Sequence, residues 1–350
     1  MNIKTKLILF LALIFFLHSC TKKEFEGPSI EILYGEFEII DPLKITNKIP
    51  SFSSNEQVSF HCEFNKPVEW TITIQGLTTS ASREITGFSN LIDSNMVFWN
   101  GGPSQLPFFS EEDCAIELTF KNEIDTIRDT ISIVSAKTYE NGIWVENFED
   151  GLPENGLVYY KPDGGEMTFY VENDSALLGN SYFKMGGRVN WDWSLGYIDL
   201  PLNIANISQN SNELYINLGV LSDLQDLHTG QFINILISEE TDTPFNDNTN
   251  NLASDLFETS MEVYKMKVPV DWQGWQIKSF RYSDFEPRLT EDNQDINFNM
   301  NPNDIRAIRI SCQACPSAGL EENCPENYMK VVRTDIDHII FTTNSSLLDQ

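Results

Sequence analysis

Apolar and polar residues alternate along most of this chain, which is the pattern of half-buried β-strands. Helical periodicity is almost absent, and clusters of Asn, Asp, Gly and Pro separate the alternating segments. In the N-terminal third the alternation predicts four strands, at residues 58–64, 70–74, 114–120 and 127–134. Later strands are predicted at residues 214–220, 232–237, 261–268, 275–280, 305–310 and 336–341. The predicted fold class is therefore all-β.

The alternation breaks around residues 136–142, and this break predicts a boundary between two domains. Residues 30–137 form the first domain and residues 138–350 the second. The second domain contains strands without a helical crossover, which favours one large antiparallel jelly roll. The polar and acidic segment from Glu239 to Ser260 is expected to be a long surface loop of that domain.

The first 19 residues have the pattern of a signal peptide. Lys4 and Lys6 precede an apolar run at residues 7–17, which is shorter than the roughly 20 apolar residues of a spanning helix. The run ends in Leu-His-Ser followed by Cys20, and this sequence resembles a bacterial lipobox. The resemblance implies lipidation of Cys20, a tether at residues 20–29 and membrane attachment through acyl chains. The alternative is an ordinary secretory signal with an incidental cysteine.

Charge narrows the choice of partners. The chain carries a formal net charge of −29 at pH 7. Loss of the signal peptide would remove Lys4 and Lys6 and make the charge more negative. Such a negative surface repels phosphate backbones, so a nucleic-acid partner is not expected. It also repels anionic lipid headgroups, so attachment to a membrane would depend on the lipid at Cys20.

Six cysteines in an exported chain predict disulfides before metal sites. Cys62 and Cys114 share a strand face with their apolar neighbours, so both side chains are expected to point into the first domain. We therefore predict a disulfide between Cys62 and Cys114. A second disulfide is expected to join Cys324 to either Cys312 or Cys315, and the sequence leaves this choice open.

The first domain resembles the immunoglobulin-like domains of bacterial surface proteins. The resemblance is carried by two inward cysteines with Trp70 between them, by the FWNGG turn at residues 98–102 and by the strands at residues 114–134. Trp70 follows Cys62 more closely than in antibody domains, so the resemblance concerns the sandwich and not the strict antibody topology. Such domains usually act as spacers, and this is the role expected here.

The second domain resembles galactose-binding-type jelly rolls, which include many carbohydrate-binding modules. The motifs are NFEDG at residues 147–151, DWQGWQIKSFRYSDF at residues 271–285 and DIDHIIF at residues 335–341. In that family the first and last strands often share a structural calcium ion, which takes six to eight oxygen ligands. The resemblance implies Glu149, Asp150 and Asp337 as contributors. The alternative is that these acids cap turns or face water.

The strongest candidate for ligand binding is the GGRVNWDW segment at residues 186–193. Two tryptophans lie two positions apart, flanked by glycines and by groups that can bind hydroxyls. Aromatic planes stack on the apolar faces of sugar rings, so this composition favours a glycan platform. The platform would consist of Arg188, Asn190, Trp191, Asp192 and Trp193. The alternative is that both tryptophans fill the core.

Other aromatic residues give weaker signals. Trp272 and Trp275 are assigned mainly to the core, whereas Tyr159 and Tyr160 stay undecided. The motifs G-x-S-x-G, H-E-x-x-H and G-x-G-x-x-G and the P-loop are all absent from the sequence. Binding is therefore favoured over catalysis, although paired carboxylates for glycoside hydrolysis depend on spatial and not sequence spacing.

Together these features resemble surface lipoproteins of Bacteroidetes, in which an immunoglobulin-like spacer lifts a carbohydrate-binding domain off the outer membrane. The resemblance implies a non-catalytic, lipid-anchored protein at the cell surface that binds a polysaccharide or oligosaccharide beside an outer-membrane importer. Two alternatives remain: an adhesion or assembly protein that binds a protein partner, and a carbohydrate-active enzyme on a jelly-roll scaffold. A concave aromatic groove would favour a glycan, and a flat apolar patch a protein.

Overall fold

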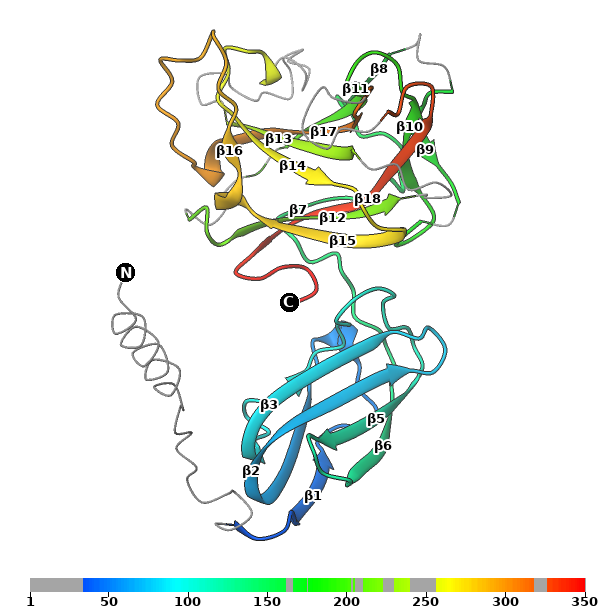
Figure 1. Cartoon of the computed structure of the whole chain (residues 1–350), viewed down its shortest axis with the longest axis vertical. Helices are drawn as coiled ribbons and strands as arrows, with labels where there is room; N and C mark the ends of the chain where they lie inside the picture. Colours follow the sequence, from blue (N-terminus) through cyan, green and yellow to red (C-terminus); the bar gives the residue numbers. More distant parts are fainter. Residues whose placement is uncertain are drawn as a thin grey trace, which may run out of the picture.

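The computed structural model shows two β-rich domains joined by a short linker (Figure 1). It describes residues 34–161, 166–174, 176–202, 204, 210–222, 230–239, 256–317 and 326–349. The predicted signal peptide, Cys20 and the tether lie outside these residues. Within them, no helix is long and apolar enough to cross a membrane. The prediction of an all-β chain is confirmed.

The first domain is organised around one very long strand, β2. Along one edge β2 pairs with β1 and then with β5, and along the other with β4 and then with β3; β6 extends the sheet beyond β5. The strands are β1 (Ile39–Ile45), β2 (Val58–Gly76), β3 (Ser82–Ile92), β4 (Phe98–Trp99), β5 (Asp113–Phe120) and β6 (Thr126–Ser132). The two strands predicted at residues 58–64 and 70–74 are therefore one continuous strand.

The predicted disulfide between Cys62 and Cys114 is wrong. Both side chains are fully buried in the core of the first domain, as expected, but both thiols are free. Cys62 lies near the start of β2, whereas Cys114 pairs with Gly76 at its far end. A disulfide needs Cα atoms about 4.4–6.8 Å apart, and the continuous strand keeps these residues too far from each other. Burial raises the pKa of Cys62 to about 11 and that of Cys114 to about 12, so both stay protonated.

The other cysteines resolve one open choice. Cys315 is disulfide-bonded, whereas Cys312 is buried with a free thiol. Cys315 is therefore the bonded member of the C-x-x-C pair. Cys324, the expected partner, lies outside the described residues.

The second domain is a sandwich of two six-stranded antiparallel sheets. The sheet that we call the junction sheet has the order β15-β12-β18-β10-β9, with β7 also paired to β18, and it lies on the side of the first domain (Figure 1). Its strands are β7 (Trp144–Glu146), β9 (Thr168–Glu172), β10 (Tyr182–Arg188), β12 (Leu214–Ser222), β15 (Gly274–Arg281) and β18 (Val331–Thr343). The first and last strands of this domain are thus neighbours.

The sheet that we call the distal sheet has the order β16-β14-β13-β17-β11-β8. Its strands are β8 (Leu157–Tyr160), β11 (Ser194–Pro201), β13 (Gln231–Glu239), β14 (Val263–Pro269), β16 (Glu286–Pro287) and β17 (Ile305–Ala314). Apolar side chains of both sheets meet in one large core between them. The six strands predicted for this domain are present, whereas β8 to β11 escaped prediction because their alternation is short or interrupted by glycine.

A small apolar cluster fixes the linker between the domains. Tyr139 of the linker packs with Ile340 and Leu347 of the second domain, and its ring centroid lies 4.1 Å from that of Phe108 in the first. The backbone carbonyl of Tyr139 also lies 2.6 Å from Nε2 of His338. The linker is therefore docked onto β18 and held by both domains.

Glu239, at the end of β13, is a buried acid of the second domain. The hydroxyl of Tyr282 donates to its Oε1 at 2.6 Å, and the backbone N–H of Asn301 donates at 2.9 Å. Burial raises the pKa of this carboxyl to about 7, and the hydrogen bonds only partly oppose the rise. Glu239 is therefore more readily neutral in the folded chain than in the unfolded one.

This shift predicts a pH dependence of stability. Because the folded pKa lies above the unfolded value, the stabilisation by the neutral carboxyl is complete below about pH 4 and is lost as the pH rises through about 7. Between pH 5 and pH 8 the free energy of unfolding should fall, by at most about 3 kcal/mol from this group. Urea denaturation should show a smaller decrease for Glu239→Gln. An equal decrease in both proteins would contradict the assignment.

Candidate functional site

The outward face of the distal sheet combines aromatic, amide and charged side chains. Strand alternation sends every second residue away from the core. On β13, Ile233, Ile235 and Ile237 point inward and are buried, whereas Phe232 and Asn234 point outward. The same alternation on β8, β11, β14 and β17 produces a continuous outward face.

Register aligns five of these outward residues in one row across five strands. Tyr159 of β8 lies opposite Tyr197 of β11, and Tyr197 lies opposite Ser311 of β17. The row continues through Asn234 of β13 to Lys267 of β14. Because neighbouring strands lie about 4.8 Å apart, the row is about 19 Å long. This is the length of a short oligosaccharide.

A stack that we call the tyrosine ladder lies at one end of this row. The rings of Tyr159 and Tyr197 stack with centroids 5.1 Å apart, and the guanidinium of Arg309 lies 3.8 Å from the Tyr197 centroid. Arg309 also lies 4.6 Å from the ring centroid of Phe257. Two hydrogen bonds of 2.6 and 2.7 Å join Arg309 to the carboxylate of Asp199 and fix the plane of the guanidinium.

Asp199 is fully buried below this ladder. Burial raises the pKa of its carboxyl, and the hydrogen bonds and charge of Arg309 counteract that rise. The charged form of Asp199 therefore depends on Arg309, because a buried carboxylate without its cation is strongly unfavourable. Asp199 acts on the face by orienting Arg309.

A second stack, the tryptophan ladder, lies on the other side of the row. Trp193 and Phe232 stack with centroids 6.5 Å apart and an interplanar angle of 27°. The ammonium of Lys267 lies 4.0 Å from the Phe232 centroid and 5.7 Å from that of Trp193. The backbone N–H of Ala314 donates to the carbonyl of Trp193 at 3.0 Å, which ties the tryptophan to the end of β17.

Polar side chains lie between the two ladders. The side-chain amide of Asn234 donates to Oε1 of Gln313 at 2.6 Å, and the hydroxyl of Ser311 donates to the backbone carbonyl of Asn234 at 3.3 Å. Aromatic planes can stack on the C–H faces of sugars, while amides and hydroxyls bind their hydroxyl groups. The face thus offers rings together with the amides of Asn234 and Gln313, whereas Ser311 itself is buried.

The structure places the predicted platform residues in different surroundings. Trp193 belongs to the tryptophan ladder. Trp191 is 71% exposed, which excludes the core alternative for this residue, and the ammonium of Lys161 lies 5.0 Å from its ring centroid. Asp192 forms an ion pair with Lys161. Asn190 accepts the backbone N–H of Asp192 at 2.8 Å and shapes the turn that presents Trp191.

Arg188 does not belong with the tryptophans. It is the last residue of β10 in the junction sheet, where it forms an ion pair with Glu166. The chain passes from one sheet to the other between Arg188 and the start of β11, so closeness in sequence misled the prediction. The prediction also missed Tyr197, Arg309 and their row. The available signal was a set of aromatic and polar residues at alternate positions of otherwise apolar strands.

Two of the three predicted calcium ligands converge on one segment. Glu149 accepts two backbone N–H groups and Asp337 accepts two more, all from residues 177–181. Asp150 is exposed, and no contact links it to this segment within the described residues. Burial raises the pKa of Asp337 to about 7, and the charge of Glu149 adds to the rise.

The fit to a metal ion is partial. A divalent cation between Glu149 and Asp337 would relieve the repulsion of two like charges, one of them buried. Across the described residues, however, no group of three or more acidic, histidine or cysteine side chains converges on one point. Further ligands would have to be backbone carbonyls or water.

Comparisons with known proteins concern the architecture. No protein-family model and no curated protein matches the chain. Among solved structures, it is similar to the family 11 carbohydrate-binding module of Clostridium thermocellum, solved with a β-1,3-1,4-mixed-linked tetrasaccharide: identity is 15%, TM-score 0.36, and coverage 57% of this chain and 93% of the module. A carbohydrate-binding module from the β-sandwich superfamily is 12% identical, with a TM-score of 0.36. The match covers 88% of this chain and 98% of that protein. An adhesin domain of Lys-gingipain from Porphyromonas gingivalis is 12% identical, with a TM-score of 0.31. The match covers 58% of this chain and 98% of the adhesin domain.

Breaking the pair below the tyrosine ladder should destabilise the second domain. Arg309→Leu leaves the buried carboxylate of Asp199 without its cation, at an expected cost of about 3–5 kcal/mol in urea denaturation. The double variant Asp199→Leu/Arg309→Leu should recover most of this loss, because no buried charge remains unpaired. Arg128→Leu, which removes an exposed pair with Glu117, should change stability by less than about 1 kcal/mol. A stable single variant would show that the pair is not needed for folding.

Proposed function

We propose that the outward face of the distal sheet binds a polysaccharide or oligosaccharide chain without catalysis. The observation that carries this proposal is the row from Tyr159 to Lys267, with the tyrosine ladder at one end, the tryptophan ladder against Lys267 at the other, and amides between them. Ring planes and hydroxyl-binding groups recur along it at the spacing of the strands. A flat apolar patch would favour a protein partner. The alternation of rings with polar groups favours a sugar chain instead.

The distribution of acids supports binding over hydrolysis. In β8, β11, β13, β14 and β17 the described carboxylates are those of Asp199 and Glu239. Asp199 is held by Arg309, and Glu239 points toward the buried Tyr282 on the core side. Glycoside hydrolysis uses two carboxyl groups about 5–9.5 Å apart on either side of the scissile bond. The outward carboxylate of these five strands, that of Asp199, is thus engaged by Arg309, which supports a role in recognition.

Removal of either ladder should test the proposal. Tyr197→Ala and Trp193→Ala each delete a ring that stacks on its neighbour, so each should weaken retention in gels cast with mixed-linkage β-glucan, xylan or alginate by at least about tenfold, or about 1.4 kcal/mol. The matched control is Phe88→Ala, which removes an aromatic ring that is 65% exposed on the first domain. Thermal melting of each variant should separate loss of binding from loss of fold.

Two outcomes would count against this site. Full retention of both stably folded ladder variants would remove the distal face from consideration. Loss of retention in Trp191→Ala alone would instead move binding to the turn formed by Asn190 and Asp192.

The location of the protein is a further part of the proposal. We place the mature chain at the outer membrane, held by lipid on Cys20, with the first domain as a spacer and an importer as a neighbouring partner. The lipobox resemblance supports the anchor. The arrangement of the domains supports the spacer role, because the distal sheet lies on the side of the second domain away from the first (Figure 1).

Calcium at Glu149 and Asp337 is proposed as a structural ion, supported by the paired acids around residues 177–181. A bound ion would stabilise only the folded chain, so exhaustive chelation should lower the melting temperature and added calcium should restore it. Asp337→Asn should melt at the same temperature with and without calcium. A wild-type melting curve that chelation leaves unchanged would assign these acids to hydrogen bonding alone.

A further inference from the structure

The junction sheet carries a second row of outward side chains. Tyr170 of β9 lies opposite Lys184 of β10, and the pairing of β10 with β18 sets Lys184 opposite Asp335. Asp335 lies opposite Leu221 of β12, which lies opposite Trp275 of β15. The row thus crosses five strands and ends in an aromatic residue on either side. From the sequence, Trp275 is assigned mainly to the core, but the register places it on the outward side of the junction sheet.

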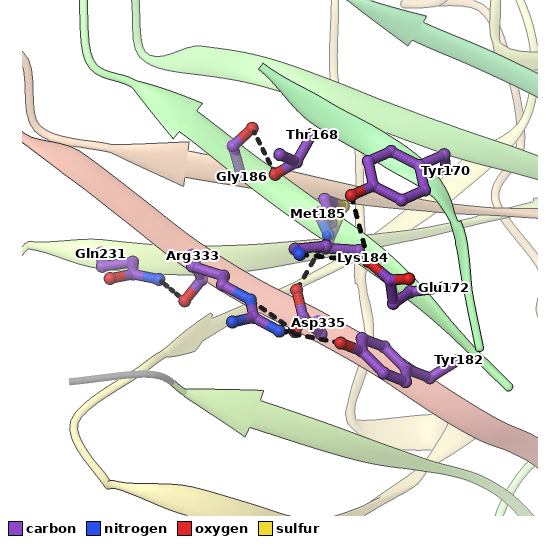
Figure 2. A network of polar contacts seen from close by, with 10 residues as sticks. All are labelled: Thr168, Tyr170, Glu172, Tyr182, Lys184, Met185, Gly186, Gln231, Arg333 and Asp335. Carbon is purple, nitrogen blue, oxygen red and sulfur yellow. Dashed lines mark hydrogen bonds and ion pairs between the residues drawn. The ribbon is translucent and has the colours of Figure 1, made fainter. Parts of the chain in front are cut away.

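A polar network surrounds the middle of this row (Figure 2). Asp335 is fully buried and accepts the backbone N–H of Met185 at 3.0 Å and Nε of Arg333 at 2.7 Å. Arg333 also donates to the hydroxyl of Tyr182 at 3.0 Å. The Tyr182 ring meets that of Trp275 edge-on, with centroids 5.7 Å apart. A buried carboxylate, an arginine and a tyrosine are therefore combined here as they are below the tyrosine ladder.

The free end of the row is formed by Tyr170. Its ring is 46% exposed, and the ammonium of Lys184 lies 5.6 Å from its centroid. Glu172 accepts a hydrogen bond from the Tyr170 hydroxyl at 3.1 Å and one from Lys184 at 3.3 Å. These contacts hold the ring with its outer side open to solvent. Figure 2 shows Tyr170, Lys184 and Glu172 together beside Asp335.

The other end of the row opens into a cleft between the domains. The cleft has a volume of about 410 Å³ and combines residues of both domains. Its lining consists of Ser104, Gln105, Leu106, Trp275, Gln276, Ile277 and Leu348. It therefore offers one indole ring together with a hydroxyl and two amides.

One long side of the row is bounded by the segment that contains Leu177. Leu177 packs against Gly219 of β12, where a Cβ atom would lie 2.3 Å from a side-chain carbon of Leu177. This segment covers the neighbouring positions of the junction sheet. The row from Tyr170 to Trp275, which we call the strip, lies beside this segment, with Asp335 buried in its middle and the Tyr170 ring exposed at its end.

We propose that this strip is a second saccharide-binding surface, which runs from Tyr170 across Lys184 and Arg333 to the cleft at Trp275. The ligand class is a sugar chain, since the strip combines ring planes with amide, hydroxyl and guanidinium donors. The surface is separate from the distal face and includes Gln105 of the first domain, so that domain contributes to binding as well as spacing. One chain long enough to reach both faces would be held at two places, and its apparent affinity would exceed that of either face.

The test compares variants of the mature chain from residue 21 in gels cast with mixed-linkage β-glucan, xylan or alginate. The distal variant is Trp193→Ala/Tyr197→Ala. The junction variant is Tyr170→Ala/Gln105→Ala, which alters two exposed side chains and should leave the melting temperature unchanged. Phe88→Ala is again the control, and Trp275→Phe serves as a second, conservative change at the cleft.

The junction variant should be retained at least about threefold less than the wild type. The distal variant should keep residual retention, which the combined four-site variant should lose. Hydrogen–deuterium exchange of the distal variant with saturating polysaccharide should show protection at residues 104–106 and 168–172.

Contrary results separate the two proposals. Wild-type retention of the junction variant, with no protection at residues 104–106, would overturn the second surface and leave the distal face intact. Absence of retention of the wild type on every polysaccharide would overturn both.

Discussion

The pairing register of β11, β17 and β13 is the constraint on which the proposed binding face depends. These strands bury isoleucines on one side and present Tyr197, Ser311 and Asn234 on the other. A shift of one residue would exchange the two sets, placing amides in the core and isoleucines in solvent. The large free-energy cost of that exchange fixes the register and with it the position of the row. The buried pair of Asp199 and Arg309 adds a second lock, because it forms only in this register.

Local pattern predicted the strands with regular alternation, but it missed short or glycine-interrupted strands such as β8 to β11 and gave no information on which strands pair. Period-two alternation located the main strands of both domains, since each buries one face. Alternation contains no information on whether two segments join into one strand, so β2 was divided and Cys62 was wrongly paired with Cys114. Likewise Arg188 was grouped with Trp193 by closeness in sequence, although the chain changes sheets between them. Tyr197 and Arg309 became neighbours only through register, which is a non-local property.

The two outward faces of the jelly roll share a common construction. Each combines a buried aspartate, an arginine oriented by it and a tyrosine in contact with the arginine. In each case burial of the acid fixes a donor group that would otherwise sample many rotamers. A preoriented donor loses little freedom when a ligand binds, which suits the polar, hydroxyl-rich sugar chains proposed as ligands of these faces. The buried side chains of Asp199 and Asp335 are therefore as important to the two proposed faces as the aromatic rings.

Docking of Tyr139 onto β18 changes what the first domain contributes. A flexible linker would let the second domain rotate freely, and that freedom would be lost each time both domains touched one ligand. In the folded chain Tyr139 packs between Phe108 of the first domain and Ile340 of the second, so the linker contacts both domains. A ligand that contacts both domains at the cleft beside Trp275 would therefore meet residues that folding already holds close together, and less freedom of the domains would be lost on binding than with a flexible linker.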